Sequence, residues 1–150
     1  MHLALFQPEI AANVGAAMRV AACFGAGLDI IGPCGFPLSD KALRRTAMDY
    51  QLIAKPSLHD SWRAFTAQPR GRLVLMTTKA DSAHTDLAFR ADDTILIGRE
   101  SSGVPDAVRA CADCAVRIAM APEARSLNMA VAAAVALAEA RRQIGWPAAN

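Results

Sequence analysis

The 150-residue sequence has few aromatic side chains, little net charge and no long apolar run. Aromatic residues make up only 5% of the chain, which argues against a base-stacking platform for single-stranded nucleic acid. No apolar run approaches the roughly 18–20 residues of a membrane helix. The N-terminal residues lack the basic region that precedes the apolar core of a signal peptide. We therefore expect a cytoplasmic protein with no membrane partner.

The composition is that of a close-packed globule. Apolar residues make up 53% of the chain, charged residues 20%, and the net charge is +2, which argues against a disordered chain. A chain of this length can bury a sizeable core without disulfides. The length fits one domain, and neither a linker nor a repeat interrupts it, so we expect a single domain over residues 1–150.

The cysteines and histidines do not form a metal-binding pattern. Cys111 and Cys114 have the C-x-x-C spacing, but a zinc site needs a second pair of ligands, and the sequence has no other close cysteine pair. The pair also reads as the tail of a short helix before a strand, which is the wrong context for a redox motif. We expect free thiols, no metal, and surface positions for the scattered histidines, which are His2, His59 and His84.

Short apolar runs alternate with segments of helical periodicity. The expected strands cover residues 3–6, 28–31, 73–76, 94–97 and 115–118. The expected helices begin at Asn13, Asp40 and Asp60 as N-caps, at Pro105, and at about Leu127, the last one ending at Ile144. This order predicts an α/β fold, a mostly parallel sheet flanked by helices.

The last predicted helix is rich in alanine, with seven alanines between Asn128 and Ile144. Alanine is the best helix former, which is one sufficient explanation. Small side chains also let another backbone approach closely, so the helix could instead be tightly packed against the sheet or a second subunit.

Three predicted loops follow strands and are small or polar, at residues 76–79, 98–103 and 119–128. Because the carboxyl ends of parallel strands share one edge of a sheet, the loops together predict a ligand pocket. The 98–103 loop has the glycine spacing of a phosphate loop but lacks the lysine and hydroxyl residue that should follow, so a nucleoside triphosphatase is excluded.

Two sets of cations could bind phosphate. Arg19 lies on the helix after the first strand, and Lys41, Arg44 and Arg45 fall on one face of the next predicted helix. Each set could hold a nucleic-acid backbone or could be an ordinary solvated surface.

Three segments together resemble the SPOUT class of RNA methyltransferases. They are Gln7-Pro8-Glu9-Ile10 through Asn13-x-Gly15-x-x-x-Arg19, Ile95-Leu96-Ile97-Gly98-x-Glu100-x-x-Gly103-Val104-Pro105, and Arg117-Ile118-x-Met120 through Arg125-Ser126-Leu127-Asn128. Gly35-Phe36, Asp40-Lys41-x-Leu43-Arg44-Arg45 and Asp49-Tyr50 are similar to the TrmL branch of small tRNA 2′-O-methyltransferases that act at the wobble nucleotide. The resemblance runs from about Leu3 to Trp146.

The resemblance implies a deep trefoil knot near the C-terminal end, an exception to the rule against threaded chains. It implies S-adenosylmethionine bound in a bent shape by the knot loops, and a homodimer with its active site shared across the interface. The implied reaction is 2′-O-methylation of cytidine or uridine at position 34 of tRNA. No metal is required for this transfer, because the leaving thioether is neutral.

Site residues follow from the resemblance position by position. Arg19 matches the catalytic arginine, and the matching active-site polar residues are Asn13, Glu100 and Asn128. The donor is expected at Met76, Gly98, Ile118 and Ser126, and tRNA phosphates at Lys41, Arg44 and Arg45. A charged arginine has no acceptor for a proton. We therefore expect Arg19 to hold a phosphate and stabilise the developing alkoxide rather than act as a base.

The chain departs from the family pattern at Ser102, Ala119, Ala130 and Ala138. We expect these departures to affect how precisely the donor is positioned and which nucleotide is preferred. Two alternative functions remain open on the sequence: 2′-O-methylation at another tRNA or ribosomal RNA site, and a tRNA-binding module without activity.

Overall fold

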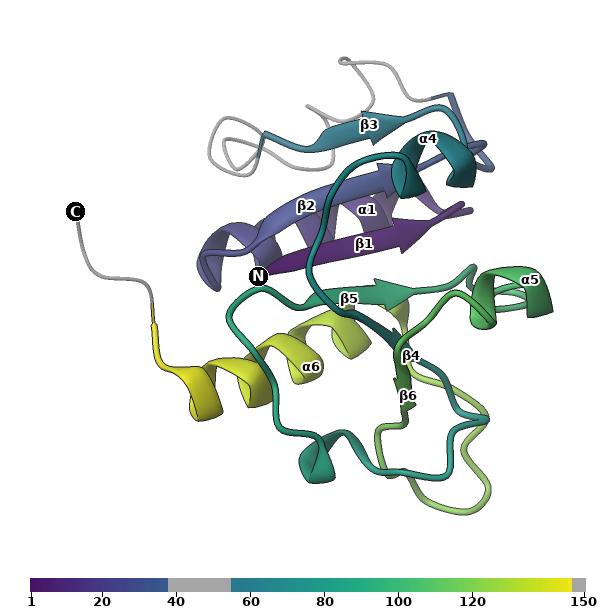
Figure 1. Ribbon diagram of the computed structural model, residues 1–150. Coiled ribbons are helices and arrows are strands. Elements are labelled where there is room, and N and C mark those ends of the chain that lie inside the picture. Colours follow the sequence, from purple (N-terminus) through teal and green to yellow (C-terminus); the bar gives the residue numbers. More distant parts are fainter. Residues whose placement is uncertain (38–54, 147–150) are drawn as a thin grey trace.

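The computed structural model describes residues 1–37 and 55–146, and within these ranges six parallel strands form one sheet (Figure 1). The strands are β1 (His2–Phe6), β2 (Gly27–Ile31), β3 (Ser57–His59), β4 (Leu73–Met76), β5 (Thr94–Ile97) and β6 (Cys114–Val116). Their order is β3-β2-β1-β5-β4-β6, and every neighbouring pair is parallel. The predicted α/β class with a parallel sheet is confirmed.

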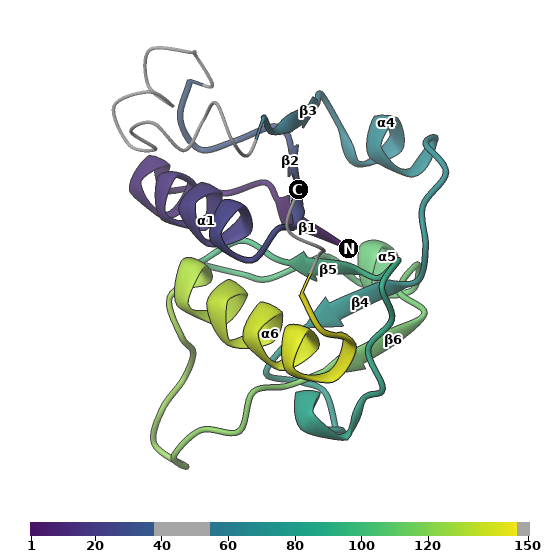
Figure 2. The same cartoon turned by 90° about the vertical axis from the view of Figure 1, so that its left-hand side faces the viewer.

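Helices cover both faces of the sheet. They are α1 (Ala11–Cys23), α4 (Trp62–Thr66), α5 (Asp106–Arg109) and α6 (Met129–Ile144), with a short 3₁₀ turn, η1 (His84–Asp86). Figure 2 shows α1 and α6 side by side on one face, with α4 and α5 on the other. None of the helices in the described ranges is long and apolar enough to cross a membrane.

The central strands β1, β5 and β4 are almost entirely apolar because both of their faces are covered. All four residues of β4 and of β5 are buried, as expected for a parallel sheet between helices. Leu3, Leu5 and Ile95 face α1 and α6, whereas Ala4, Phe6 and other alternate residues face α4 and α5. The side chains of α6 that enter this core are mostly alanines, so the close-packing explanation of its composition is correct within one chain.

The predicted strand positions are confirmed for the first four runs, and the fifth strand ends two residues earlier than predicted, at Val116. The sequence analysis missed β3, which has only three residues. The helix predicted to begin at Asp40 lies outside the described residues. Cys111 follows α5 and Cys114 begins β6, as predicted for the C-x-x-C pair.

Two predicted N-caps are wrong. Helix α1 begins after Ile10, and Asn13 lies inside its first turn, where its side chain makes tertiary contacts instead of a cap. Helix α4 is capped by Ser61 rather than Asp60, because the Ser61 hydroxyl accepts a hydrogen bond from the Ala64 N–H.

The prediction that the histidines lie on the surface is wrong for His59 and His84, which are both buried. His59 Nε2 lies 2.7 Å from Asp29 Oδ1, and His2 Nδ1 lies 2.9 Å from Asp29 Oδ2. The three residues come from β1, β2 and β3 on one face of the sheet, so a buried carboxylate provides the polar partner that His59 requires.

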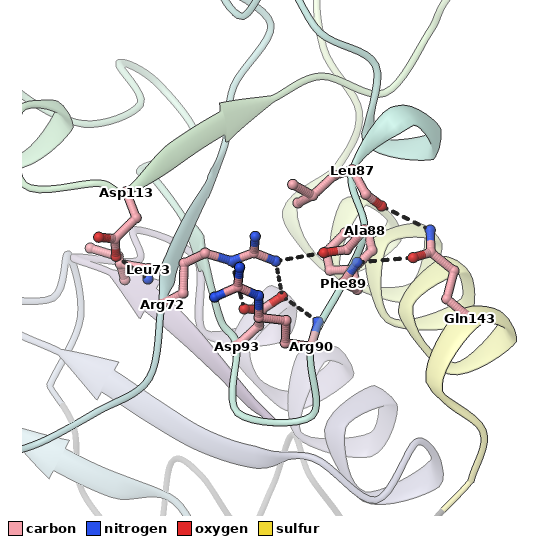
Figure 3. Close-up of polar contacts among 9 residues, drawn as sticks. All are labelled: Arg72, Leu73, Leu87, Ala88, Phe89, Arg90, Asp93, Asp113 and Gln143. Carbon is pink, nitrogen blue, oxygen red and sulfur yellow. Dashed lines mark hydrogen bonds and ion pairs between the residues drawn. The ribbon is translucent and has the colours of Figure 1, made fainter.

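Polar contacts fix the connection that leads into β5 (Figure 3). Buried Asp93 accepts two hydrogen bonds from the Arg72 guanidinium, at 2.9 and 2.8 Å, and a third from the Arg90 N–H. Gln143 of α6 accepts from the Phe89 N–H and donates to the Leu87 carbonyl. The amino ends of β4 and β5 are thereby held together, and their carboxyl ends open toward the site.

Candidate active site

A cavity of about 540 Å³ lies at the carboxyl ends of β4 and β5. It is lined by residues from each of the three loops that the sequence predicted would meet. The four predicted donor-binding residues, Met76, Gly98, Ile118 and Ser126, all line it. Apolar walls come from Leu75, Ile97, Met120, Leu127 and Met129. The pocket predicted from loops in register is therefore present.

The loop after β5 is a tight turn that depends on two glycines. Arg99 and Gly103 exchange backbone hydrogen bonds of 2.9 and 3.0 Å. A Cβ atom on Gly98 would lie 2.5 Å from the carbonyl carbon of Gly103, a distance that no side chain tolerates. Gly103 has a φ of +70°, which favours glycine. The turn keeps the 99–102 segment against the cavity.

The turn places Glu100 against the segment that joins β1 to α1. Glu100 Oε2 accepts a hydrogen bond of 2.8 Å from the Glu9 N–H, and Oε1 accepts one of 3.0 Å from Asn13 Nδ2. Both carboxylate oxygens thus accept hydrogen bonds, one from the loop before α1 and one from the first turn of α1. The predicted pair Asn13 and Glu100 is in direct contact.

Asn128 joins this pair from the third loop. Its Nδ2 donates a hydrogen bond of 2.8 Å to Asn13 Oδ1, and its Oδ1 accepts from the N–H groups of Ala130 and Val131. Asn128 is therefore the N-cap of α6 and a partner of Asn13 at once. Three predicted active-site residues form one continuous chain of hydrogen bonds beside the cavity.

Glu9 supports the same turn from outside, and the sequence analysis assigned it no role. Its carboxylate accepts from the Ser101 N–H and the Ser101 hydroxyl, both at 2.8 Å. These hydrogen bonds from Ser101 hold the pKa of Glu9 below its usual range. Next to it, Arg99 donates to Gln7 Oε1 and lies over the Phe6 ring at 5.5 Å. Two further side-chain contacts, Glu9 with Ser101 and Arg99 with Gln7, thus hold the segment before α1 against the turn after β5.

The remaining predicted site residues are not at the cavity. Arg19 is exposed on α1 and does not line it. Lys41, Arg44 and Arg45 lie outside the described residues. The cavity is lined instead by four cations that were not predicted as site residues: Lys79, Arg99, Arg109 and Arg125. Their positions in or next to the strand-end loops were the only signal in the sequence.

The described residues contain no group of three or more histidine, cysteine or acidic side chains that could hold a metal ion. Cys34 is half-buried near the site. Burial, with a further contribution from the Glu100 carboxylate, raises the pKa of its thiol to about 11. This thiol is a poor nucleophile at neutral pH.

Comparisons with known proteins agree with this geometry. The model of the SpoU rRNA Methylase family matches residues 1–138. A relative from Beijerinckia indica subsp. indica, named tRNA (cytidine(34)-2'-O)-methyltransferase, is 51% identical over 146 residues, which cover 95% of this chain and 91% of the relative.

Two solved structures have the same fold over nearly the whole chain. One, concerned with the 2-OH methylation of C/U34 on tRNA, has a TM-score of 0.88 at 42% identity and covers 95% of both chains. The SpoU methyltransferase AviRb from Streptomyces viridochromogenes, in complex with the cofactor AdoMet, has a TM-score of 0.84 at 29% identity. That match covers 96% of this chain and 60% of AviRb. With the family model matched over residues 1–138 and a relative above half identity, this chain belongs to the SpoU methylase family.

Proposed function

We propose that this chain transfers a methyl group from S-adenosylmethionine to the ribose 2′-hydroxyl of cytidine or uridine at position 34 of tRNA. One observation carries the proposal: the cavity lined by Met76, Gly98, Ile118 and Ser126 adjoins the hydrogen-bonded chain of Glu100, Asn13 and Asn128. The Beijerinckia relative and the solved structure on C/U34 methylation support the choice of position.

The cavity fits the donor. Its volume of about 540 Å³ lies within the roughly 300–1,000 Å³ of small-molecule sites. Methionine, isoleucine and leucine side chains give it apolar walls for a flat base, and Gly98 and Ser126 are part of its lining. When bound, S-adenosylmethionine supplies an electrophilic methyl group on a sulfonium centre. The AviRb structure in complex with AdoMet supports this cofactor.

The residues beside the cavity position the acceptor. Asn13 lies in the first turn of α1, Glu100 in the turn after β5, and Asn128 at the N-cap of α6, and hydrogen bonds fix them to one another and to the α6 N-terminus. A rigid set of this kind aligns donor and acceptor and so lowers the entropic part of the barrier. Arg19 would bind the phosphate next to the target ribose and stabilise the developing alkoxide, since a guanidinium has donors only.

Arg19 requires a second copy of the chain for this role. It is exposed on α1 and lies outside the lining of its own cavity, which supports a homodimer in which Arg19 of one copy reaches the cavity of the other. Apolar side chains flank the Asn13–Asn128 contact and remain exposed: Ile10, Leu127 and Val131. Such a surface suits burial against a partner, and the dimer would place it beside both sites.

The resemblance places further tRNA contacts at Lys41, Arg44 and Arg45. The proposed substrate is found in the cytoplasm, where we expect the enzyme to act. These assignments, like the trefoil knot, stay predictions.

The test is methylation of total tRNA with labelled donor, followed by complete alkaline digestion. Alkaline cleavage needs a free 2′-hydroxyl, so a ribose-methylated site survives as a labelled dinucleotide. We expect the label in a dinucleotide that carries cytidine or uridine from position 34. Label found only in mononucleotides would mean base methylation, and absence of label with intact tRNA binding would mean a binding module.

The role of Arg19 is tested by Arg19→Lys, which keeps the charge and loses the bidentate guanidinium. We expect a large loss of kcat with unchanged donor affinity. Near-normal turnover would contradict the role given to the guanidinium. Mixed dimers of Arg19→Ala and Asn128→Ala chains give the second readout. One restored site per dimer is expected if Arg19 acts across the interface.

A further inference from the structure

Positive charge outweighs negative charge in the lining of the cavity. Four cations line it, Lys79, Arg99, Arg109 and Arg125, against one carboxylate, that of Glu100. Both oxygens of Glu100 are already occupied by Glu9 and Asn13. Within the described ranges, none of the four cations forms an ion pair with a carboxylate.

Three other arginines of the described residues are satisfied internally. Arg72 is paired with Asp93, Arg142 with Glu139, and Arg141 donates to the carbonyls at the end of α1. S-adenosylmethionine has a sulfonium and an ammonium group against a single carboxylate, so the donor alone does not balance this wall.

The backbone of Lys79 and the guanidinium of Arg109 both contact the Thr77 side chain at the end of β4. The Thr77 hydroxyl oxygen accepts a hydrogen bond of 3.3 Å from the backbone N–H of Lys79 and one of 3.4 Å from Arg109 Nη2. Lys79 is exposed and Arg109 is half-buried, and all three residues line the cavity. The Arg109 guanidinium thus contacts the Thr77 hydroxyl, and the exposed Lys79 follows two residues later in the same lining loop. A hydroxyl, a guanidinium and an ammonium are donors suited to an oxyanion.

We propose that Lys79, Arg109 and Thr77 form a phosphate-binding corner that holds the RNA backbone at the mouth of the cavity. The proposal rests on the proposed function and adds a contact on the β4 side of the site. A phosphate there would hold the RNA strand at the β4 side of the cavity. Phosphate contacts of this kind set position and not sequence.

The experiment measures binding rather than turnover. A labelled RNA hairpin with the sequence of a tRNA anticodon stem-loop is titrated with the chain, in saturating S-adenosylhomocysteine, at several salt concentrations. The variants are Lys79→Gln and Arg109→Gln. The control is Arg63→Gln, which removes the same charge from an exposed position on α4 away from the cavity.

Each corner variant is expected to weaken hairpin binding roughly tenfold. Each should also lower the slope of log Kd against log salt by about 0.7–1, the loss of one phosphate contact. Arg63→Gln should match the wild type in both hairpin affinity and salt slope. Arg109→Lys should keep the slope, because the charge is retained. Calorimetry should find donor affinity unchanged in all variants.

Two results would overturn the proposal. Equal slopes for the corner variants and Arg63→Gln would mean that the corner does not contact RNA. Loss of donor affinity with an unchanged slope would mean that the cations hold the donor's own carboxylate. Because no methyl transfer is measured, failure here is separate from failure of the proposed function, which the alkaline digestion of labelled tRNA decides.

Discussion

Asn128 donates a hydrogen bond of 2.8 Å to Asn13 while its other side-chain atom caps α6. The two residues are 115 positions apart, and through Asn13 the bond reaches Glu100. One side chain therefore has two separable tasks: it starts a helix, and it orients Asn13 and, through it, Glu100, the two residues proposed to position the acceptor. The amide nitrogen performs the second task and the amide oxygen the first.

Asn128→Asp separates these tasks. Aspartate is as good an N-cap as asparagine, so thermal stability should be close to that of the wild type. The carboxylate has no N–H for Asn13 Oδ1, so the Asn13–Glu100 pair loses its anchor. Loss of one neutral hydrogen bond, about 1 kcal/mol, corresponds to a fall in kcat of roughly fivefold at unchanged donor affinity.

Asn128→Ala is the matched comparison and loses both tasks. It should lower the free energy of unfolding by about 1 kcal/mol, within the range for a lost N-cap, and lower kcat as well. Equal stability of the two variants in denaturant unfolding would contradict the capping role. Full activity of Asn128→Asp would contradict the role of the bond to Asn13.

The stability that the Glu9 carboxylate gives to the 99–103 turn should depend on pH. Hydrogen bonds from Ser101 lower the pKa of Glu9 from its ordinary value of 4.5. A lowered folded-state pKa contributes stability that is present above pH 4.5 and is lost as the pH falls through the folded value. The stability difference between the wild type and Glu9→Gln should therefore shrink as the pH is lowered across this window.

Ser101→Ala is the control for Glu9, because it removes the hydroxyl donor and keeps the backbone donor. Its stability should lie between those of the wild type and Glu9→Gln at neutral pH. Urea unfolding at a series of pH values measures both. A difference between the wild type and Glu9→Gln that does not change with pH would show that the Glu9 carboxylate does not hold the turn through its charge.

The sequence predicted where the pocket lies, but it did not predict the hydrogen bonds beside the pocket. The pocket followed from three strand-end loops, because parallel strands must open at the same edge, and Met76, Gly98, Ile118 and Ser126 meet there. Asn13 was taken as a helix cap because its residue type favours caps. The structure uses it instead for contacts with Glu100 and Asn128 that no local pattern encodes.

Long-range pairing also explains the wrong prediction for His59. A three-residue strand carries too little periodicity to be recognised, and burial of His59 depends on Asp29 from the neighbouring strand. The carboxylate of Asp29 lies 30 positions away in sequence, so the partner becomes visible only once β2 and β3 are aligned. Arg109 was not predicted at the cavity because its place in the lining also depends on packing between segments distant in sequence.

Gly98→Ala should disable the site without unfolding the chain. A Cβ atom at residue 98 would lie 2.5 Å from backbone atoms of Gly103, so the turn must shift. The shift would move Glu100 away from Glu9 and Asn13 and would alter the cavity wall. We expect at least a tenfold loss of donor affinity by calorimetry, equivalent to about 1.4 kcal/mol.

The matched control for Gly98→Ala is Gly145→Ala, at the end of α6, where a Cβ atom would meet nothing within 4 Å. That position has a φ of +78°, so alanine there should lower stability but leave donor affinity unchanged. Equal donor affinity for both variants and the wild type would mean that the tight 98–103 turn is not required for the cavity.

The Cys34 thiol should resist alkylation at neutral pH. Burial, aided by the Glu100 carboxylate, raises its pKa from 9.0 to about 11, which lowers the thiolate fraction about a hundredfold. Cys23 and Cys111 are exposed and provide internal standards. After a pulse of iodoacetamide, peptide mapping should find label on these two cysteines and little on Cys34. Denaturant should bring Cys34 to the rate of the others. Labelling of Cys34 at the rate of Cys111 in the folded chain would contradict both its burial and its place beside Glu100.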